Sequence, residues 1–454
     1  MIKKTTLVVV LCAAALGAAV YYFDWKGGNE KTPAVDASKP AFAIQAADVV
    51  SFMIAHPAQP DDSPIRFEKR AGVWRIVQPI ETNADQSTAK GIVDQLAGAR
   101  IAQTEPGSAD RRKAFGLEPP KASLDFQLAN GAKHSLLFGD GDFTGDSVYT
   151  VVDGGQSVSL LPQLLSTSAA KSLDDLRDRA ILHVDSERVA SFSLKNAGGN
   201  LTVSKNKDEW EFAVPAATLA GNEDVDSLLQ AVANAKMISV ASEKPDNLAR
   251  YGLAAPAITF TVSDSKGMKA TLIVGKKDGA SYFARDISRS TIFRIDEDIY
   301  KKLSEKFGDL RDKRVLHADA AGLQRIEIQN SSGSIVLSRQ PDKTDEWTFD
   351  SPADRKGKPV SSWRVLNPIG SLRAEEVFDH PPANLLAQLA NPAIRLVLTG
   401  KDGKELNLRI SKPSGDFVYA QATGNGAIYK LKKQIFDELN VSAANLAAGD
   451  AAPN

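Results

Sequence analysis

The chain has 454 residues, of which 43% are hydrophobic and 24% are charged. This length suits about three domains, and the composition excludes a disordered, collagen-like or multi-span membrane protein. Lys and Arg number 55 against 56 Asp and Glu, so the net charge is −1 and no basic excess indicates a nucleic-acid partner. The single cysteine excludes a disulfide framework or a cysteine-based zinc site within one chain.

Residues 1–25 are typical of a membrane anchor. Lys3 and Lys4 precede an uncharged run over residues 5–23, which is nearly long enough to cross a hydrocarbon core of about 30 Å. The positive-inside rule keeps both lysines in the cytoplasm. We therefore predict a single pass through the cytoplasmic (inner) membrane, with the lipid bilayer contacted by residues 5–23, the N-terminus inside and the body in the periplasm.

A cleaved signal peptide is the alternative, because residues 17–19 are small and suit a peptidase. The uncleaved anchor is favoured, since the apolar run continues into aromatic residues at 21–25 that suit a membrane interface. A lipoprotein is disfavoured because Leu11 precedes Cys12, where a small residue is needed. Residues 26–46 are rich in Gly, Pro, Ala, Lys and Asp and are predicted to be a flexible linker.

Internal similarity with a period of roughly 136 residues dominates the rest of the chain. Three tryptophans recur at this period, and each is followed by a proline at the same short distance; they are Trp74, Trp210 and Trp347. An aromatic-Gly-Leu-x-x-Pro element at 115–120 recurs at 251–256 and survives as Leu-x-x-Pro at 389–392. A Leu-Leu-Phe-Gly element at 136–139 recurs as Leu-Ile-Val-Gly at 272–275 and more weakly at 408–411.

A Leu-Arg-Asp element at 176–183 recurs at 310–317. The shared spacing predicts three tandem repeats over residues 47–182, 183–316 and 317–445, the third divergent, followed by a disordered tail at 446–454.

Periodicity in the second repeat predicts an α+β unit. Alternating or apolar segments indicate strands at 189–194, 201–204, 209–214, 258–263, 270–274, 281–285 and 291–295. Helical spacing indicates helices at 224–236 and 298–310. The predicted fold is therefore one transmembrane helix and three α+β repeats, each a mainly antiparallel sheet with about two helices.

The recurring residues are interpreted mainly as structural. The three tryptophans are expected to anchor cores, with a glycan-stacking platform as the alternative. Gly116 and Gly252 are expected in turns that a Cβ would block, and the following prolines, Pro120 and Pro256, lead into strands. The pairs Arg177/Asp178 and Arg311/Asp312 are expected to form hydrogen bonds between repeats, with docking of a partner as the alternative.

The anchor, the aromatic-Gly-Leu-x-x-Pro element and the Leu-Arg-Asp element together resemble the domain-of-unknown-function family 4340. The match is best at residues 115–120, 251–256, 176–182 and 310–316. The resemblance implies genomic neighbours from gliding-motility-type ABC transport systems. It implies no catalytic residues, because none are established for the family.

A search for chemistry assigns no catalytic, cofactor-binding or metal-binding residue and no cofactor. The five histidines are not at metal-ligand spacing, and no nucleophile elbow or phosphate loop is present in the sequence; the histidines are His56, His134, His183, His317 and His380. The segment 139–146 places oxygen ligands as a calcium loop does, but Val151 stands where an EF-hand has glutamate. A solvated hairpin loop is therefore expected.

The leading functional prediction is non-enzymatic. The body would be an extracytoplasmic scaffold or accessory subunit of a membrane complex, with ABC-transporter permease and ATPase subunits as partners. The first alternative is an envelope glycan-binding module that uses exposed aromatics such as Trp363 or Tyr149. The second is an envelope hydrolase with carboxylates from different repeats.

Overall fold

The computed structural model describes residues 39–59, 62–317, 322–341, 346–423 and 426–448. The predicted anchor and residues 26–38 of the predicted linker lie outside this set. Within the described ranges, no helix is both long enough and apolar enough to cross a bilayer. The chain divides into two compact units at Arg179 and Ala180, and each unit is described by itself.

The first unit contains one antiparallel sheet with the strand order β4-β3-β2-β1-β6-β7-β8-β9-β5. Its strands are β1 (Val49–Ala55), β2 (Ile65–Arg70), β3 (Val73–Gln78), β4 (Thr82–Asn83), β5 (Gln103–Pro106), β6 (Ala122–Leu128), β7 (Lys133–Gly141), β8 (Ser147–Val152) and β9 (Ser157–Pro162). Its helices are η1 (Ala46–Asp48), α2 (Gln86–Gly98), α3 (Ala109–Ala114), α4 (Gln163–Ala169) and α5 (Leu173–Leu176).

The second unit contains two sheets. The first of them has the order β13-β12-β11-β10-β15-β16-β17-β18-β14. Its strands are β10 (Val189–Asn196), β11 (Gly199–Asn206), β12 (Glu209–Val214), β13 (Thr218–Leu219), β14 (Ser239–Ser242), β15 (Ile258–Asp264), β16 (Lys269–Asp278), β17 (Ser281–Asp286) and β18 (Ile292–Ile295). Its helices are η2 (Ser186–Arg188), α6 (Asn222–Asn234), η3 (Leu248–Tyr251), α7 (Glu297–Leu303) and α8 (Phe307–Leu310).

The other sheet of this unit has the order β21-β20-β19-β23-β24-β25-β26-β22. Its strands are β19 (Leu323–Asn330), β20 (Gly333–Arg339), β21 (Trp347–Ser351), β22 (Glu376–Phe378), β23 (Ile394–Gly400), β24 (Glu405–Ile410), β25 (Phe417–Ala422) and β26 (Ile428–Lys432). Its helices are η5 (Ala353–Arg355), α9 (Trp363–Gly370), α10 (Ala383–Ala390) and α11 (Lys433–Leu439). The fold is thus α+β, with three mainly antiparallel sheets.

The strand order of the first two sheets is the same, strand for strand, and the third sheet follows it except at one edge. There, the two-residue strand is replaced by an isolated bridge between Thr348 and Pro359. Most neighbours in each order are consecutive strands of an antiparallel sheet, whereas the central pair and the last pair join strands that are not consecutive in the chain.

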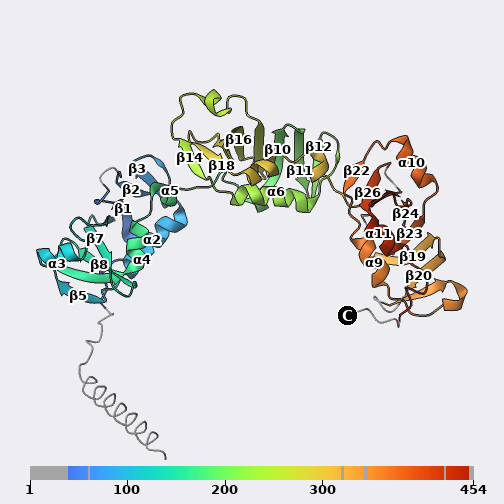
Figure 1. The fold of residues 1–454 in the computed structure, drawn as a ribbon, viewed down its shortest axis with the longest axis horizontal. Coiled ribbons are helices and arrows are strands. Elements are labelled where there is room, and N and C mark those ends of the chain that lie inside the picture. Colours follow the sequence, from blue (N-terminus) through green and yellow to red (C-terminus); the bar gives the residue numbers. More distant parts are fainter. Residues whose placement is uncertain (1–38, 60–61, 318–321, 342–345, 424–425, 449–454) are drawn as a thin grey trace, which may run out of the picture. The chain divides into compact units, whose positions relative to one another are not determined.

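Helices cover the main core on one face of each sheet, as Figure 1 shows for α6 and the sheet around β10. The apolar side of α6 carries Val225, Leu228, Leu229 and Val232, all buried in that core. Alternation along a strand sends neighbouring residues to opposite faces. Accordingly Leu272 and Val274 join the main core, whereas Ile273 packs in a smaller cluster beside η3.

The three repeated tryptophans are buried core residues, as predicted. Their exposed fractions are 5% at Trp74, 1% at Trp210 and 2% at Trp347. The proline that follows each tryptophan in its repeat is preceded by a cis peptide bond. Indoles enclosed by a core are not available as a surface for stacking sugars, so the alternative interpretation of these three residues is wrong.

The strand predictions in the second repeat are close to the structure, and the strand at 209–214 has the predicted bounds. The predicted helix over 298–310 is wrong, because α7 and α8 are separate helices. Asn196 lies on a distant strand, and its amide donates to the carbonyls of Leu303 and Glu305 at 3.0 and 2.8 Å. These bonds satisfy carbonyl groups at the break, and Asp309 accepts from the backbone of Lys306 to start α8.

The predicted boundaries need correction at both ends. Phe42 lies in the predicted linker, yet it is only 5% exposed in the first core, and Ala41 bonds to the backbone of Ala99 at 2.9 Å. Leu446 lies in the predicted tail, yet it is fully buried in the third core. Both segments carry an apolar residue that fills a core, so order begins by residue 39 and extends to residue 448.

The Leu-Arg-Asp element crosses a junction instead of closing a repeat. Leu176 belongs to the core of the first sheet, whereas Ile181 and Leu182 belong to the core of the second. In the same way Leu310 packs in the second core and Leu316 in the third. The predicted boundaries at 182 and 316 therefore fall several residues too late.

Candidate functional site

The aromatic-Gly-Leu-x-x-Pro element makes a close backbone contact with a neighbouring strand. Gly252 ends η3 in the left-handed region, with φ of +73°. A Cβ on Gly275, in β16, would lie 2.1 Å from the carbonyl oxygen of Tyr251, and Gly139 has the same 2.1 Å relation to Phe115. The pairing of β16 and β17 is irregular between Val274 and Lys277, as is usual where a strand glycine permits close approach. These motif residues are therefore structural.

In the third sheet, different residues occupy the positions of the glycine turn and of the strand glycine. Helix α10 occupies the place of the glycine turn, and Ser411 stands where the other sheets have Gly139 and Gly275. Ser411 is 1% exposed, and its hydroxyl accepts from the backbone of Tyr419 at 3.0 Å. The absence of the glycine motif from the described part of the third sheet thus has a packing reason.

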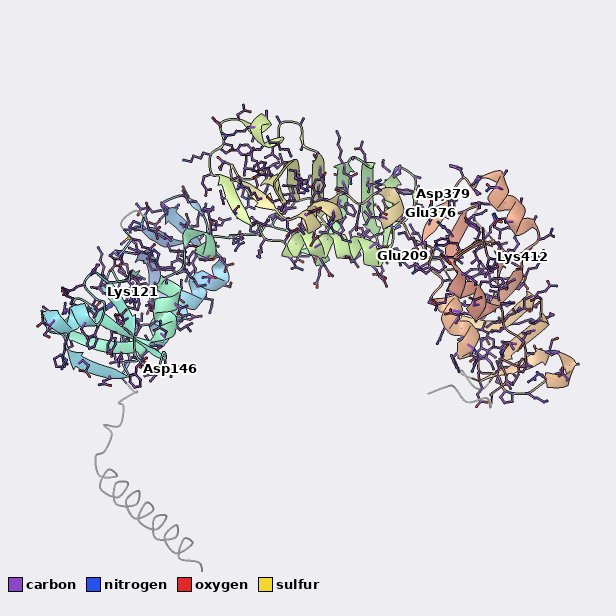
Figure 2. All side chains as sticks on the ribbon, in the orientation of Figure 1. Lys121, Asp146, Glu209, Glu376, Asp379 and Lys412 are labelled. Atoms are coloured by element: carbon purple, nitrogen blue, oxygen red, sulfur yellow. The ribbon has the colours of Figure 1, made fainter. Side chains whose placement is uncertain are left out.

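Arg311 joins residues of the second and third sheets, as predicted. Its side chain is 9% exposed and pairs with Asp379, which follows β22. Arg314 pairs with Asp312 at 2.6 Å and with Glu209 at 3.3 Å. Figure 2 labels the acidic partners Glu209 and Asp379. Asp312 therefore serves a local pair rather than the predicted one between repeats.

In the first unit, Arg177 is similarly buried, with a side chain 4% exposed, and it pairs with Asp174 at 3.1 Å. This pair lies within the unit. Close by, the Ser172 hydroxyl and backbone lower the pKa of Asp175 by hydrogen bonding to its carboxylate. These bonds between Ser172 and Asp175 cap the start of α5, and Ser442 and Asn445 make corresponding bonds near the C-terminus with an amide in place of the carboxylate.

In the segment that resembles a calcium loop, the Asp142 carboxylate accepts hydrogen bonds from other groups of the same segment. Asp142 accepts from the Thr144 hydroxyl at 2.7 Å and from the backbone of Gly145 and Ser147. These bonds lower the pKa of Asp142. No group of three or more His, Cys, Asp or Glu side chains is arranged for a metal in the described part of the chain. The geometry fits a solvated hairpin between β7 and β8.

Two histidines have clear structural partners. His56 is buried and bonds through Nε2 to the carbonyl of Ala169 at 2.9 Å, and it also pairs with Asp62. His134 pairs with Asp153 at 2.9 Å. These contacts give both imidazoles a role in holding the fold together.

The two aromatic residues proposed for glycan binding differ. Tyr149 stacks on Phe115 with ring centroids 3.9 Å apart, so one ring face is covered in a small apolar cluster. Trp363 is 51% exposed at the start of α9. It borders a pocket of about 570 Å³ that sequence reasoning did not identify.

Two further hollows lie on sheet faces away from the main cores. The hollow on the third sheet has a volume of about 460 Å³, and its charged and amide side chains are Glu327, Gln329, Arg395, Asn407, Arg409 and Gln421. Cross-strand register brings them together, since Arg395 is opposite Arg409, which donates to Gln421 at 2.6 Å. Alternation of polar and apolar residues along β23 and β24 is the signal that indicates this face.

The first sheet has a related hollow of about 360 Å³, bordered by Met53, Arg66 and Asp125. Partial burial raises the pKa of Asp125, and the positive charge of Arg66 opposes this effect. The sheet surfaces that carry these two hollows are what we call the open faces of the first and third sheets.

A family model described as a domain of unknown function, DUF4340, matches residues 74–220 and 210–392. The two matches begin at Trp74 and Trp210 and together span more than half of the sequence. The chain therefore belongs to the DUF4340 family. No curated protein matches the chain.

Proposed function

We propose that the three sheets are tandem copies of one repeating unit, and that the segment 1–25 holds them at the cytoplasmic membrane. The shared strand order supports this, as do the buried tryptophans at matching places. Antiparallel sheets of separate copies, each with its own core, need only short junctions to follow one another in a chain. The Leu-Arg-Asp element is such a junction.

The body acts as a non-enzymatic extracytoplasmic scaffold or accessory subunit of a membrane complex. The observation that carries this proposal is the pair of open faces on the first and third sheets. On each, polar and charged side chains from central strands form a hollow beside a rigid core. Binding groups on strands are held more firmly than groups on loops, which suits recognition of a protein partner.

Family resemblance suggests the partner, namely the permease and ATPase subunits of an ABC transporter that handles envelope material. The open face of the third sheet indicates what charge a bound segment of such a partner would carry. Arg395 and Arg409 are exposed and adjacent, so an acidic segment of a permease would complement them.

The carboxyl groups of the described residues support a hydrolytic role less well than the open faces support a scaffold. Burial raises the pKa of Asp125 and of Glu305, the two described carboxyl groups in which such an increase is resolved. Asp125 lies beside Arg66, and Glu305 bonds to Lys302 at 2.7 Å. Each thus has a cation as its main partner, an arrangement that structural ion pairs also produce.

The test is purification of the tagged full-length protein in a mild detergent, with mass spectrometry of the proteins that remain bound. We expect permease and ATPase subunits, and we expect their loss when residues 1–25 are replaced by a cleavable signal. The double variant Arg395→Glu, Arg409→Glu should also lose them. Lys433→Glu, an exposed reversal on α11, is the matched control and should retain them. Recovery of the protein alone would refute the scaffold proposal.

A further inference from the structure

The pocket beside Trp363 lies in a groove between α9 and the segment that starts with α11. One wall is formed by Trp363 and Asn367 of α9 and by Ser371, which directly follows the helix; their spacing of four residues puts them on one side of it. The opposite side of α9 is buried through Val365 and Ile369. The other wall includes Asp437, Glu438, Asn440 and Asn445.

The matching segment of the second sheet carries an ion pair. Asn196 and Asn330 mark equivalent positions, because each ends the first long strand of its sheet and its amide bonds to a carbonyl in the closing helical segment, at Glu305 and Val441 respectively. In the second sheet, Lys302 bonds to Glu305 at 2.7 Å, and both side chains are only about a quarter exposed, at 26% and 23%.

Among the described residues, the third sheet holds no such pair at these positions, since the residues that match Lys302 and Glu305 at the repeat period are Glu438 and Val441. The aromatic residue is also particular to it. Ala220 and Val360 each bond to the carbonyl of the buried tryptophan of their sheet, and three residues later stand Glu223 and Trp363 respectively. The third sheet thus combines a pocket, an exposed indole and the loss of the ion pair at the matching positions.

The indole is presented to solvent with a defined neighbour. The Arg364 guanidinium lies 5.1 Å from the centre of the Trp363 ring system, a distance at which cation–π attraction restrains both groups. The exposed fraction of Trp363 is 51%, against at most 5% for the three buried tryptophans. An exposed flat apolar surface beside polar side chains suits a ligand with the same mixture of surfaces.

The polar groups around the indole are three amides, two carboxylates, the Ser371 hydroxyl and the Arg364 guanidinium. Asn367, Asn440 and Asn445 can each donate and accept hydrogen bonds, and Asp437 and Glu438 accept them. Asn440 Oδ1 is buried and has no hydrogen-bond partner among the described residues. Such an oxygen needs a donor from outside the protein, such as a ligand hydroxyl or a water molecule. Two carboxylates against one guanidinium leave the pocket with a net negative charge, which disfavours a phosphate-rich ligand.

We propose that this pocket binds a pyranose unit of a neutral or N-acetylated envelope glycan. The C–H face of the sugar stacks on the Trp363 indole, and its hydroxyl groups bond to the amides and carboxylates. The inference goes beyond the scaffold proposed above and shares with it only the extracytoplasmic location, because the open faces and this pocket use different residues.

The test is isothermal titration calorimetry of the full-length protein in detergent with two probes, the tetramer of N-acetylglucosamine and cellotetraose. We expect at least one to bind with a dissociation constant of about 1 mM or lower. Trp363→Ala should weaken this binding at least about tenfold, and Trp363→Phe, which keeps a stacking surface, should weaken it less. Asn367→Ala should weaken it with the indole intact.

Phe143→Ala is the matched control, because Phe143 is a 98% exposed aromatic residue on the first unit, and its loss should leave binding unchanged. Circular dichroism checks that each variant is folded. Failure of both probes to bind would overturn the proposal. Binding that survives both Trp363→Ala and Asn367→Ala, or that Phe143→Ala weakens equally, would also overturn it.

Discussion

Gly275→Ala tests the structural explanation of the family motif. The new Cβ would lie 2.1 Å from the Tyr251 carbonyl oxygen and 3.0 Å from the carbonyl carbon of Gly252. Ordinary contacts are at 3.4 Å or more, so the backbone of β16 or of the glycine turn must move by roughly 1 Å. Overpacking of this kind costs about 1–3 kcal/mol. Because both neighbours are backbone, we expect the upper end, about 3 kcal/mol.

Hydrogen–deuterium exchange of the full chain measures this cost locally. A loss of about 3 kcal/mol corresponds to roughly a hundredfold faster exchange in β16 and η3, where exchange occurs through opening of the fold. Gly308→Ala is the matched control, since its Cβ meets no atom within 4 Å on α8. That change should be neutral or stabilising by up to about 1 kcal/mol. Equal protection in Gly275→Ala and the wild type would refute the close-contact explanation.

Three other changes probe separate contacts. Trp210→Phe removes the hydrogen bond, 3.0 Å long, that the indole donates to Asp226. In a denaturant titration it should lower the free energy of unfolding by about 1 kcal/mol more than a buried Trp-to-Phe change without such a bond, and an equal loss at Trp74→Phe would contradict this. Arg311→Ala should lower the free energy of unfolding by about 1–2 kcal/mol, and adding Asp379→Ala should lower it little further, because the two side chains form one ion pair. Additive losses in the double-mutant cycle would disprove an interaction between them. Asp175→Asn should keep the helix cap but remove its acid sensitivity, because the lowered folded pKa of Asp175 means that its carboxylate contributes stability above about pH 4 that is lost as the pH falls through the folded pKa. The melting temperature of the variant should therefore fall less between about pH 5 and 3 than that of the wild type, and an identical fall would contradict the assignment.

Local patterns in the sequence predicted much of the fold. The strand at 209–214 and the helix near 224–236 were recognisable because alternation and helical spacing depend on neighbours in the chain. The burial of the three tryptophans followed from their shared period. The family, too, was recognisable from short motifs, and the match over residues 74–392 confirms it.

The tertiary structure decided the features that depend on distant partners. The helix expected over 298–310 is broken where Asn196 bonds to its carbonyl groups, more than a hundred residues away. The exact boundary between the first two sheets within the Leu-Arg-Asp element could not be predicted from sequence, because only packing assigns Leu176 to one core and Ile181 to the next.

The candidate pocket shows the same limit. Exposure of Trp363 was a prediction from sequence, but its polar surroundings come from residues 437–445, which lie far along the chain from it. Sequence periodicity by itself determined many of the strands and the buried side of α6, since these are set by short-range geometry. Only the tertiary structure determined the pocket beside Trp363, because its two walls come from segments that are far apart in the chain.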